Sequence, residues 1–277
     1  MRGFDAKQAR SWDEKGYLVL EGAADPGLIS EVRDTIWQAL GMRPDHPSDW
    51  YDESLRALTG IDQRGMIPIY HDAPLWRCRQ LPLLYAAFRD LYGDEDLRVS
   101  IDRVNMNPPV RADWPYDGFI HWDIDVARRP VPFVLQGLLA LSDSGPGEGG
   151  FQCVPGFHRR IEAWLDTQPE GYATRFPDVS GMEIEFVPLK AGDFLIWHSA
   201  LPHGNTPNRS DRPRLAQYIT MKPANQIPAA VQAQQLEAIL RGVAPVAPGG
   251  TQLPPDAREI TFNCHLTELG RRLVGMP

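Results

Sequence analysis

The sequence has few cysteines, no long hydrophobic run and no signal-peptide core. Its three cysteines, Cys78, Cys153 and Cys264, are far apart, which argues against a disulfide framework or a cysteine zinc site and indicates reduced thiols in a cytoplasmic protein. The longest apolar stretches, such as FVLQGLLAL, are far shorter than the ~20 residues that a membrane span needs. We therefore expect a cytoplasmic protein without a membrane partner.

Positive charge is also scarce, because 28 Lys and Arg stand against 36 Asp and Glu, a formal net charge of −8. The basic residues are scattered along the chain, which argues against a nucleic-acid partner. The chain does have 277 residues, 43% of them hydrophobic, enough for one sizeable core. We expect a single domain over residues 1–277 that acts on a small molecule.

Helical patterns dominate residues 1–95. Asp25 is expected to cap a helix that ends at Gly41, since apolar residues between them recur at the spacing of one helix face. Residues 82–93 repeat this pattern. The short apolar stretch at 16–22 is bounded by glycines and predicts a strand.

Residues 96–222 consist of short apolar stretches separated by Gly, Pro and Asp, which predicts a β fold of the jelly-roll, cupin-like kind, a double-stranded β-helix. Residues 223–277 form a tail with helices predicted near 229–242 and 266–276. The Pro/Gly-rich connector between those helices is expected to be mobile and without regular structure. The expected fold is therefore mainly β with flanking helices.

The stretch FIHWDIDV brings a histidine and a carboxylate close together. His121 and Asp123 would share one face of an extended strand, and two imidazoles with one carboxylate form the iron site of non-haem oxygenases. His203 is the candidate for the second imidazole, because a late strand of a jelly roll returns beside an early one. His198 is an alternative, although its place in the apolar run DFLIWHS is more typical of a core histidine.

Arg214 opens the apolar strand after the turn that follows His203 and is a candidate to bind a carboxylate through its guanidinium. Arg212 competes for this role but lies within the turn. Asn105 and Asn107 alternate along an earlier strand, where they would line the same cavity or form a polar strand edge.

Three residues are candidate substrate contacts, each with a simpler structural explanation. Trp122 could instead complete the core, while Asp125 and Arg103 could be ordinary surface charges. His71 and His158 are weaker candidates, the first in the helical part of the chain and the second at the entry of a helix.

At these motifs the sequence resembles the phytanoyl-CoA dioxygenase family, a branch of the Fe(II)/2-oxoglutarate-dependent oxygenases, over roughly residues 15–220. HWD is similar to the family's His-x-Asp motif, GEGGFQCVPGFHR to its Gly-rich turn and Pro-Gly-x-His signature, and HGNTPNRSDRPR to its distal His and Arg. The resemblance implies a double-stranded β-helix, iron held by His121, Asp123 and His203, and 2-oxoglutarate held by Arg214.

The family pattern is not complete in this sequence. Trp122 stands where the family often has Gln, Leu138 where a later strand has Trp, and Asn107 where a Lys contacts the co-substrate. Asn105 and Asn107 are therefore our candidates for the remaining co-substrate contacts.

The resemblance also implies an activity, in which Fe(II), 2-oxoglutarate and O2 hydroxylate an unactivated C–H bond and release succinate and CO2. Asp123 favours hydroxylation, because halogenating relatives lack this carboxylate. The alternatives are a cupin-like metal-binding protein without turnover and an oxygenase that modifies a protein partner.

Overall fold

The computed structural model describes residues 3–62, 64–172, 174–247, 250–258 and 264–276. Its helices are α1 (Ala6–Lys15), α2 (Pro26–Leu40), α3 (Glu53–Thr59), α4 (Ala73–Arg79), α5 (Pro82–Tyr92), α6 (Ile161–Leu165), α7 (Ala229–Arg241) and α8 (Glu268–Leu273). Its strands are β1 (Tyr17–Leu20), β2 (Met66–Ile67), β3 (Leu97–Val99), β4 (Val104–Asn107), β5 (Leu135–Ala140), β6 (Phe151–Cys153), β7 (Glu185–Phe186), β8 (Phe194–His198), β9 (His203–Asn205), β10 (Arg214–Tyr218) and β11 (Met221–Pro223).

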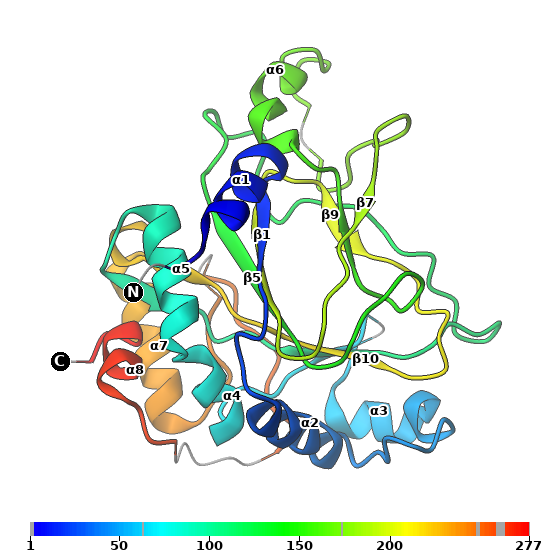
Figure 1. The fold of residues 1–277 in the computed structure, drawn as a ribbon. Coiled ribbons are helices and arrows are strands. Elements are labelled where there is room, and N and C mark those ends of the chain that lie inside the picture. Colours follow the sequence, from blue (N-terminus) through cyan, green and yellow to red (C-terminus); the bar gives the residue numbers. More distant parts are fainter. Residues whose placement is uncertain (1–2, 63, 173, 248–249, 259–263, 277) are drawn as a thin grey trace.

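The strands form antiparallel sheets at the centre of the molecule (Figure 1). The larger sheet has the order β1-β8-β5-β10-β4-β2, and the smaller one has the order β7-β6-β9. A further pair, β11-β3, forms a separate two-stranded sheet, in which β11 follows β10 and β3 precedes β4 along the chain. Strands distant in sequence therefore become neighbours, which is the topology expected of a jelly roll.

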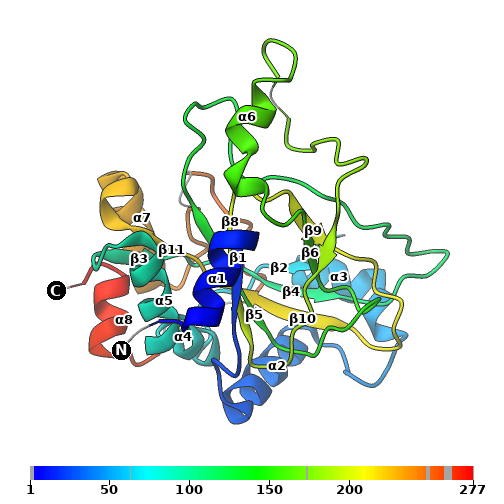
Figure 2. The ribbon, with the colours of Figure 1, turned by 45° about the horizontal axis from the view of Figure 1, so that its top comes forward.

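The larger sheet is buried on both faces, as β8 shows by its alternation. Phe194 and Ile196 belong to the core on the helix side, whereas Leu195 and Trp197 belong to the core shared with the smaller sheet. Helices α2, α4 and α5 cover the first of these cores. Figures 1 and 2 show α4, α5, α7 and α8 gathered on one side of the sheets.

The predicted helices form where the sequence places their ends. Asp25 accepts a hydrogen bond from the backbone N–H of Leu28 at the start of α2, and Gly41 ends the helix with φ 62°. The helices predicted at 82–93, 229–242 and 266–276 are α5, α7 and α8. The first third is nevertheless not purely helical, because β1 and β2 form the two edges of the larger sheet.

The connector predicted to be irregular at 243–255 contains one isolated bridge, between Val246 and Gln252, and residues 248–249 lie outside the described part. The three cysteines carry free thiols. None of the helices within the described ranges has both the length and the apolar character to cross a membrane. The assignment of residues 1–277 to one domain stays a prediction.

His198, at the end of β8, gives the fold a dependence on pH. Burial, and the charge of His158, lower the pKa of His198 from 6.5 to about 4. Between these pH values the unfolded chain takes up a proton that the folded protein excludes. The contribution of neutral His198 to the unfolding free energy is therefore fully present above pH 6.5 and is lost as the pH falls toward 4, by at most about 1.4 kcal/mol per pH unit.

Replacing His198 by Phe is therefore expected to make the unfolding free energy less dependent on pH between 6.5 and 4. Phe keeps ring contacts with Trp12 and Phe133, which His198 makes at centroid distances of 6.1 and 5.1 Å. Urea denaturation of both proteins across this range measures the difference. Equal slopes would show that His198 is protonated equally in the folded and unfolded chains.

Candidate metal centre

Two histidines and one aspartate meet where the smaller sheet gains an additional bridge. His203 is the first residue of β9, and it exchanges two backbone hydrogen bonds with His121, of 2.8 and 3.0 Å. Asp123 lies in the bend that follows His121. Residues that are remote in sequence are thus fixed side by side by backbone pairing, as expected.

The side chains of this triad converge on one point. His121 Nε2 lies 3.3 Å from Asp123 Oδ1, and His203 Nε2 lies 3.6 Å from Asp123 Oδ2. One ligand atom from each residue falls within 4.8 Å of the other two. Two imidazole nitrogens and a carboxylate oxygen in this arrangement suit a non-haem Fe(II) ion.

The hydrogen bonds of the imidazoles leave the metal-facing nitrogens available. His203 Nδ1 lies 2.9 Å from the carbonyl oxygen of Leu201, an arrangement in which Nδ1 carries the proton and Nε2 keeps a lone pair. Burial lowers the pKa of His121, despite its contact with Asp123, and so favours the neutral ring that a metal requires. These side chains therefore fit the iron ion that the fold implies.

Gly204 allows the two segments of the site to approach each other. A Cβ atom at this position would lie 1.8 Å from the carbonyl oxygen of Phe119, too close for any side chain. The glycine after His203 thus permits the bridge that brings His121 beside it.

Asp123 is held from both sides by residues outside the triad. Arg175 Nη2 donates to Oδ1 at 2.7 Å, and Gln136 Nε2 donates to Oδ2 at 2.9 Å. Burial acts against its negative charge, but the contacts with His121 and His203 outweigh burial and hold the pKa of this carboxyl well below its ordinary value. Asp123 is therefore an anion across the physiological range of pH.

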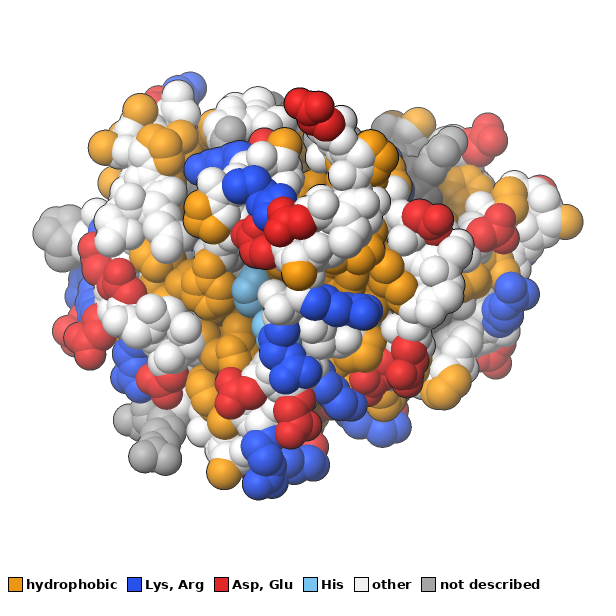
Figure 3. All heavy atoms as spheres, turned by 90° about the horizontal axis from the view of Figure 1, so that it is seen from above, with side chains coloured by type: hydrophobic (Ala, Val, Ile, Leu, Met, Phe, Trp, Pro, Cys, Tyr) orange, Lys and Arg blue, Asp and Glu red, His pale blue; other side chains and the backbone are white. Residues whose placement is uncertain are grey.

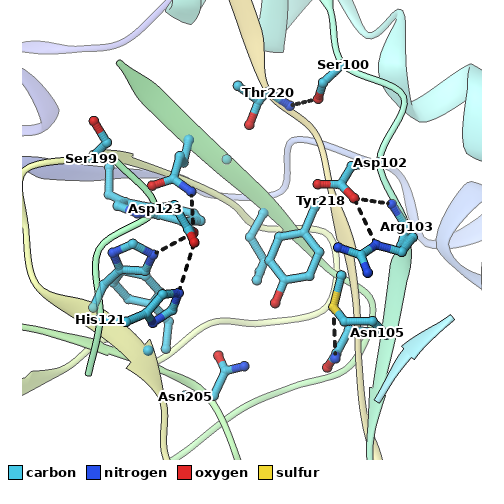
Figure 4. Close-up of a pocket in the computed structure, with 18 of the residues that line it drawn as sticks. Ser100, Asp102, Arg103, Asn105, His121, Asp123, Ser199, Asn205, Tyr218 and Thr220 are labelled. Atoms are coloured by element: carbon cyan, nitrogen blue, oxygen red, sulfur yellow. Dashed lines mark hydrogen bonds and ion pairs between the residues drawn. The ribbon is translucent and has the colours of Figure 1, made fainter. Parts of the chain in front are cut away.

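The triad lies on the wall of a cavity of about 400 Å³ between the two sheets. Figure 4 shows Tyr218 in this cavity, with His121 and Asp123 on one side of it and Asp102 and Arg103 on the other. In the space-filling view, histidine side chains are visible in a hollow among hydrophobic ones, with Lys and Arg side chains around it (Figure 3). The size of the cavity suits a small molecule.

Arg214 is the first residue of β10 and is buried, with 4% of its surface exposed. Its Nε donates to the carbonyl oxygen of Gly149 at 3.0 Å, and its Nη1 donates to Asn105 Oδ1 at 3.2 Å. Nη2 is buried and has no hydrogen-bond partner among the described residues. A buried guanidinium without a carboxylate partner is costly, and the carboxylate of 2-oxoglutarate would supply one.

The two asparagines differ in their positions. Asn105 lines the cavity, accepts from Arg214, and donates from Nδ2 to the carbonyl oxygen of Arg64 at 2.9 Å. Asn107 pairs in register with Arg214 but is buried against Gly149 and is not among the cavity-lining residues. Co-substrate contacts by both asparagines stay predictions, of which Asn105 has the direct structural support.

Of the three candidate substrate contacts, only Arg103 lines the cavity. Trp122 is fully buried, donates to the carbonyl oxygen of Ala200 at 3.0 Å and packs on Phe157. Asp125 is exposed and accepts from a nearby backbone N–H, because the chain turns at this point instead of continuing as a strand. The structure therefore places Trp122 in the core and Asp125 on the surface, and neither residue lines the cavity.

The alternative ligands also lie away from the centre. His198 accepts from the backbone of Ala200 and packs among aromatic rings, and His71 is buried 2.7 Å from the carbonyl oxygen of Val243. His158 lies in a 3-10 turn before α6. Arg212 is exposed and pairs with Glu148 at 3.3 Å, so the buried guanidinium is that of Arg214.

Two residues that hold Asp123 were missed by sequence reasoning. Gln136 is the one polar side chain in the apolar run FVLQGLLAL, a signal that could have pointed to it. Arg175 comes from the long loop between α6 and β7 and has no such signal. It also anchors that loop, because its carbonyl oxygen accepts from the backbone N–H of Trp122 at 2.9 Å.

We expect Arg175→Met to weaken Fe(II) binding about tenfold, because Asp123 loses a partner that orients its carboxylate. Anaerobic titration with Fe(II) measures the change. The matched control is Arg129→Met, since Arg129 is a half-exposed arginine paired with Glu162 and Asp166, and its removal should leave the affinity unchanged. Tighter binding by Arg175→Met would show instead that the guanidinium competes with the metal.

Comparison with known proteins adds sequence evidence to this geometry. The family model described as phytanoyl-CoA dioxygenase (PhyH) matches residues 12–216. A Dictyostelium discoideum protein named after phytanoyl-CoA dioxygenase is 24% identical over 262 residues, covering 78% of this chain and 75% of that one. The 2-aminoethylphosphonate dioxygenase of uncultured bacterium HF130_AEPn_1 is 22% identical over 230 residues, covering 79% and 82%.

A solved structure supports the fold. The epimerase SnoN in complex with Fe3+, alpha ketoglutarate and nogalamycin RO superposes with a TM-score of 0.57 at 21% identity, covering 79% of this chain and 83% of that one. The predicted jelly-roll fold with flanking helices is confirmed.

Proposed function

Because the chain belongs to the phytanoyl-CoA dioxygenase family and is thus an Fe(II)- and 2-oxoglutarate-dependent dioxygenase, we propose that it hydroxylates an unactivated C–H bond of a small molecule. Succinate and CO2 are the other products. We place this activity in the cytoplasm, in keeping with the three free thiols.

One juxtaposition carries the proposal. His121, Asp123 and His203 line a cavity that Asn105 also lines, and Asn105 accepts a hydrogen bond from Arg214, whose buried Nη2 has no partner among the described residues. A metal-binding protein without turnover has a use for the triad but none for the unpaired guanidinium. Both features together suit a metal ion and a dicarboxylate co-substrate.

Different residues would hold the iron ion and the 2-oxoglutarate. When bound, iron and 2-oxoglutarate supply the oxidising power for attack on a C–H bond, using O2. His121 and His203 present neutral nitrogens, and Asp123 presents a negative charge that Arg175 and Gln136 keep in place. Three protein ligands leave further coordination positions of the metal free for non-protein groups.

Arg214 would bind and orient the co-substrate. Gly149 and Asn105 fix its guanidinium from two directions, so the unpartnered Nη2 is held ready without a further change of the side chain. A preordered guanidinium loses little side-chain freedom when it binds a carboxylate.

Apolar side chains beside the triad would position the substrate and exclude water. Phe119 lies with its ring centroid 4.8 Å from that of His121, and Phe151 and Trp197 lie on the other side near His203. All three line the cavity. The names of the similar proteins also refer to small molecules, 2-aminoethylphosphonate and nogalamycin, which supports a small substrate.

The test is incubation of candidate small molecules with the protein, Fe(II), 2-oxoglutarate and oxygen-18 gas. We expect one succinate for each product molecule, and a product that carries one oxygen-18 atom. A product of unchanged mass would assign epimerisation to the site, and a product that lacks two hydrogens would assign desaturation. Either result would overturn the hydroxylation.

A further inference from the structure

The cavity continues beyond the metal ligands to a region that their chemistry does not require. Ser100, Asp102, Thr220 and Lys222 line this region, together with Arg103. Figure 4 shows Tyr218 between Asp102 and Arg103 on one side and His121 and Asp123 on the other, with Ser100 and Thr220 above them in the view. These residues come from β11, from the segment between β3 and β4, and from the link between β10 and β11.

Lys222 is the cation of this region that lacks a counter-charge. Its Nζ makes no hydrogen bond or ion pair within the part of the chain that the structure describes. Burial lowers the pKa of Lys222, and no carboxylate contributes to raise it. A half-buried ammonium group that faces a cavity in this way is suited to bind an anion from outside the protein.

Arg103 adds a second cation that is only partly neutralised. Its Nε lies 3.3 Å from Asp102 Oδ1, while the same oxygen also accepts from the backbone N–H of Arg103 at 2.7 Å. Its two terminal nitrogens form no hydrogen bond or ion pair with the described residues, and they remain available to a ligand. Ser100 and Thr220 contribute hydroxyl groups to the same region.

The charged residues that line the cavity have a net positive charge, whereas the whole chain has a net negative charge. Among the cavity's described lining residues, Arg64, Arg103, Arg175 and Lys222 outnumber Asp102 and Asp123, although the whole chain has a net charge of −8. A metal ion at the triad would add further positive charge. Such a field attracts anionic ligands and disfavours cationic ones.

Lys222 lies on a different strand and in a different sheet from Arg214, the clamp proposed for 2-oxoglutarate. Leu215, Ile219 and Met221 all face the helix-side core, whereas Tyr218 and Lys222 alternate with them and line the cavity. From residue 214 to residue 222 the extended chain advances up to about 26 Å. Arg214 pairs in register with Asn107, and Lys222 pairs with Arg98, so the two cations lie at opposite ends of these paired segments and are assigned to different ligand groups.

We propose that the substrate carries an oxyanion group, a carboxylate or a phosphonate, which binds to Lys222 and Arg103 while the bond to be oxidised lies at the metal ligands. This inference rests on the proposed function, because it names the class of substrate for the same site. The anion fixes one end of the substrate, and the distance from Lys222 to the triad selects the carbon that reacts.

The test measures binding instead of turnover. Pentanoate, propylphosphonate and the neutral pentanamide are titrated calorimetrically into the protein, first without metal and then anaerobically with Fe(II) and saturating 2-oxoglutarate. We expect one or both oxyanions to bind and the amide not to bind. The preference between the two oxyanions assigns the carboxylate or the phosphonate.

Lys222→Met is expected to weaken this binding about tenfold or more, while the affinity for 2-oxoglutarate stays within about twofold. Lys222→Arg should preserve binding, and Lys7→Met is the matched control on the exposed face of α1. Arg103→Gln, expected to weaken binding as well, provides a second test if Lys222→Met folds poorly.

The inference is overturned if neither oxyanion binds, if pentanamide binds equally well, or if Lys222→Met and Arg103→Gln both bind like the wild type. Failure of the proposed function has a different signature. In that case 2-oxoglutarate would fail to bind or to yield succinate, whereas the Lys222-dependent binding of the metal-free protein would be unaffected.

Discussion

Asp123→Ala is expected to abolish 2-oxoglutarate turnover, with a loss of about a thousandfold or more in succinate formation. The substitution removes the one anionic ligand of the triad and leaves two imidazoles. The resulting loss of activity should exceed the 10–100-fold loss that typically follows removal of a residue that hydrogen-bonds to a metal ligand. Its side chain is 37% exposed, so the fold should tolerate the change. Succinate release at saturating Fe(II) measures the effect, and urea denaturation checks the fold.

Asp125→Ala is the matched control for this experiment. Asp125 is an aspartate in the same loop, but it is exposed, and its carboxylate accepts from the backbone N–H of Ala127. Wild-type turnover is expected for this variant. If Asp123→Ala kept more than a tenth of the wild-type rate, or Asp125→Ala lost as much, the carboxylate ligand would be wrongly assigned.

Arg214→Met is expected to raise the concentration of 2-oxoglutarate required for half-maximal succinate formation by about a hundredfold. The physical reason is the loss of a buried charge-assisted contact, which typically costs 2–5 kcal/mol. Binding of Fe(II) should change little, because Arg214 is hydrogen-bonded to Gly149 and Asn105 and contacts none of the three ligands. Titration of both the metal and the co-substrate separates the two effects.

Two companion variants sharpen this result. Arg212→Met removes an exposed arginine two positions earlier, which pairs with Glu148, and should leave the requirement for 2-oxoglutarate unchanged. Arg214→Lys keeps a charge but not the planar fork, so an intermediate requirement is expected. An unchanged requirement in Arg214→Met would contradict the clamp, and a large change in Arg212→Met would transfer it to the neighbouring residue.

Much of the fold could be predicted because its signals are local. The cap at Asp25 and the glycine after α2 fix a helix within a few residues, and the Gly, Pro and Asp breaks between 96 and 222 indicate short strands. The triad could be found for a similar reason, since HWD and HG are compact motifs. Their meeting depends only on the return of a late strand beside an early one.

The rest of the site depends on register, which local patterns do not fix. Trp122 lies between two metal ligands and still points into the core, because the chain bends at Asp123 and its indole reaches the carbonyl oxygen of Ala200. Arg175 reaches Asp123 from a loop, and Lys222 lines the cavity from β11, which lies outside the larger sheet. None of these positions follows from hydrophobic alternation alone.

The most direct test of the iron and 2-oxoglutarate site is anaerobic visible spectroscopy of the purified protein with Fe(II) and 2-oxoglutarate. We predict the weak charge-transfer band of an iron-bound 2-oxo acid, lost in His203→Ala and shifted to higher 2-oxoglutarate concentration in Arg214→Met. A well-folded wild-type protein that binds iron and shows no band at any 2-oxoglutarate concentration would contradict this account and favour a metal-binding protein without this co-substrate.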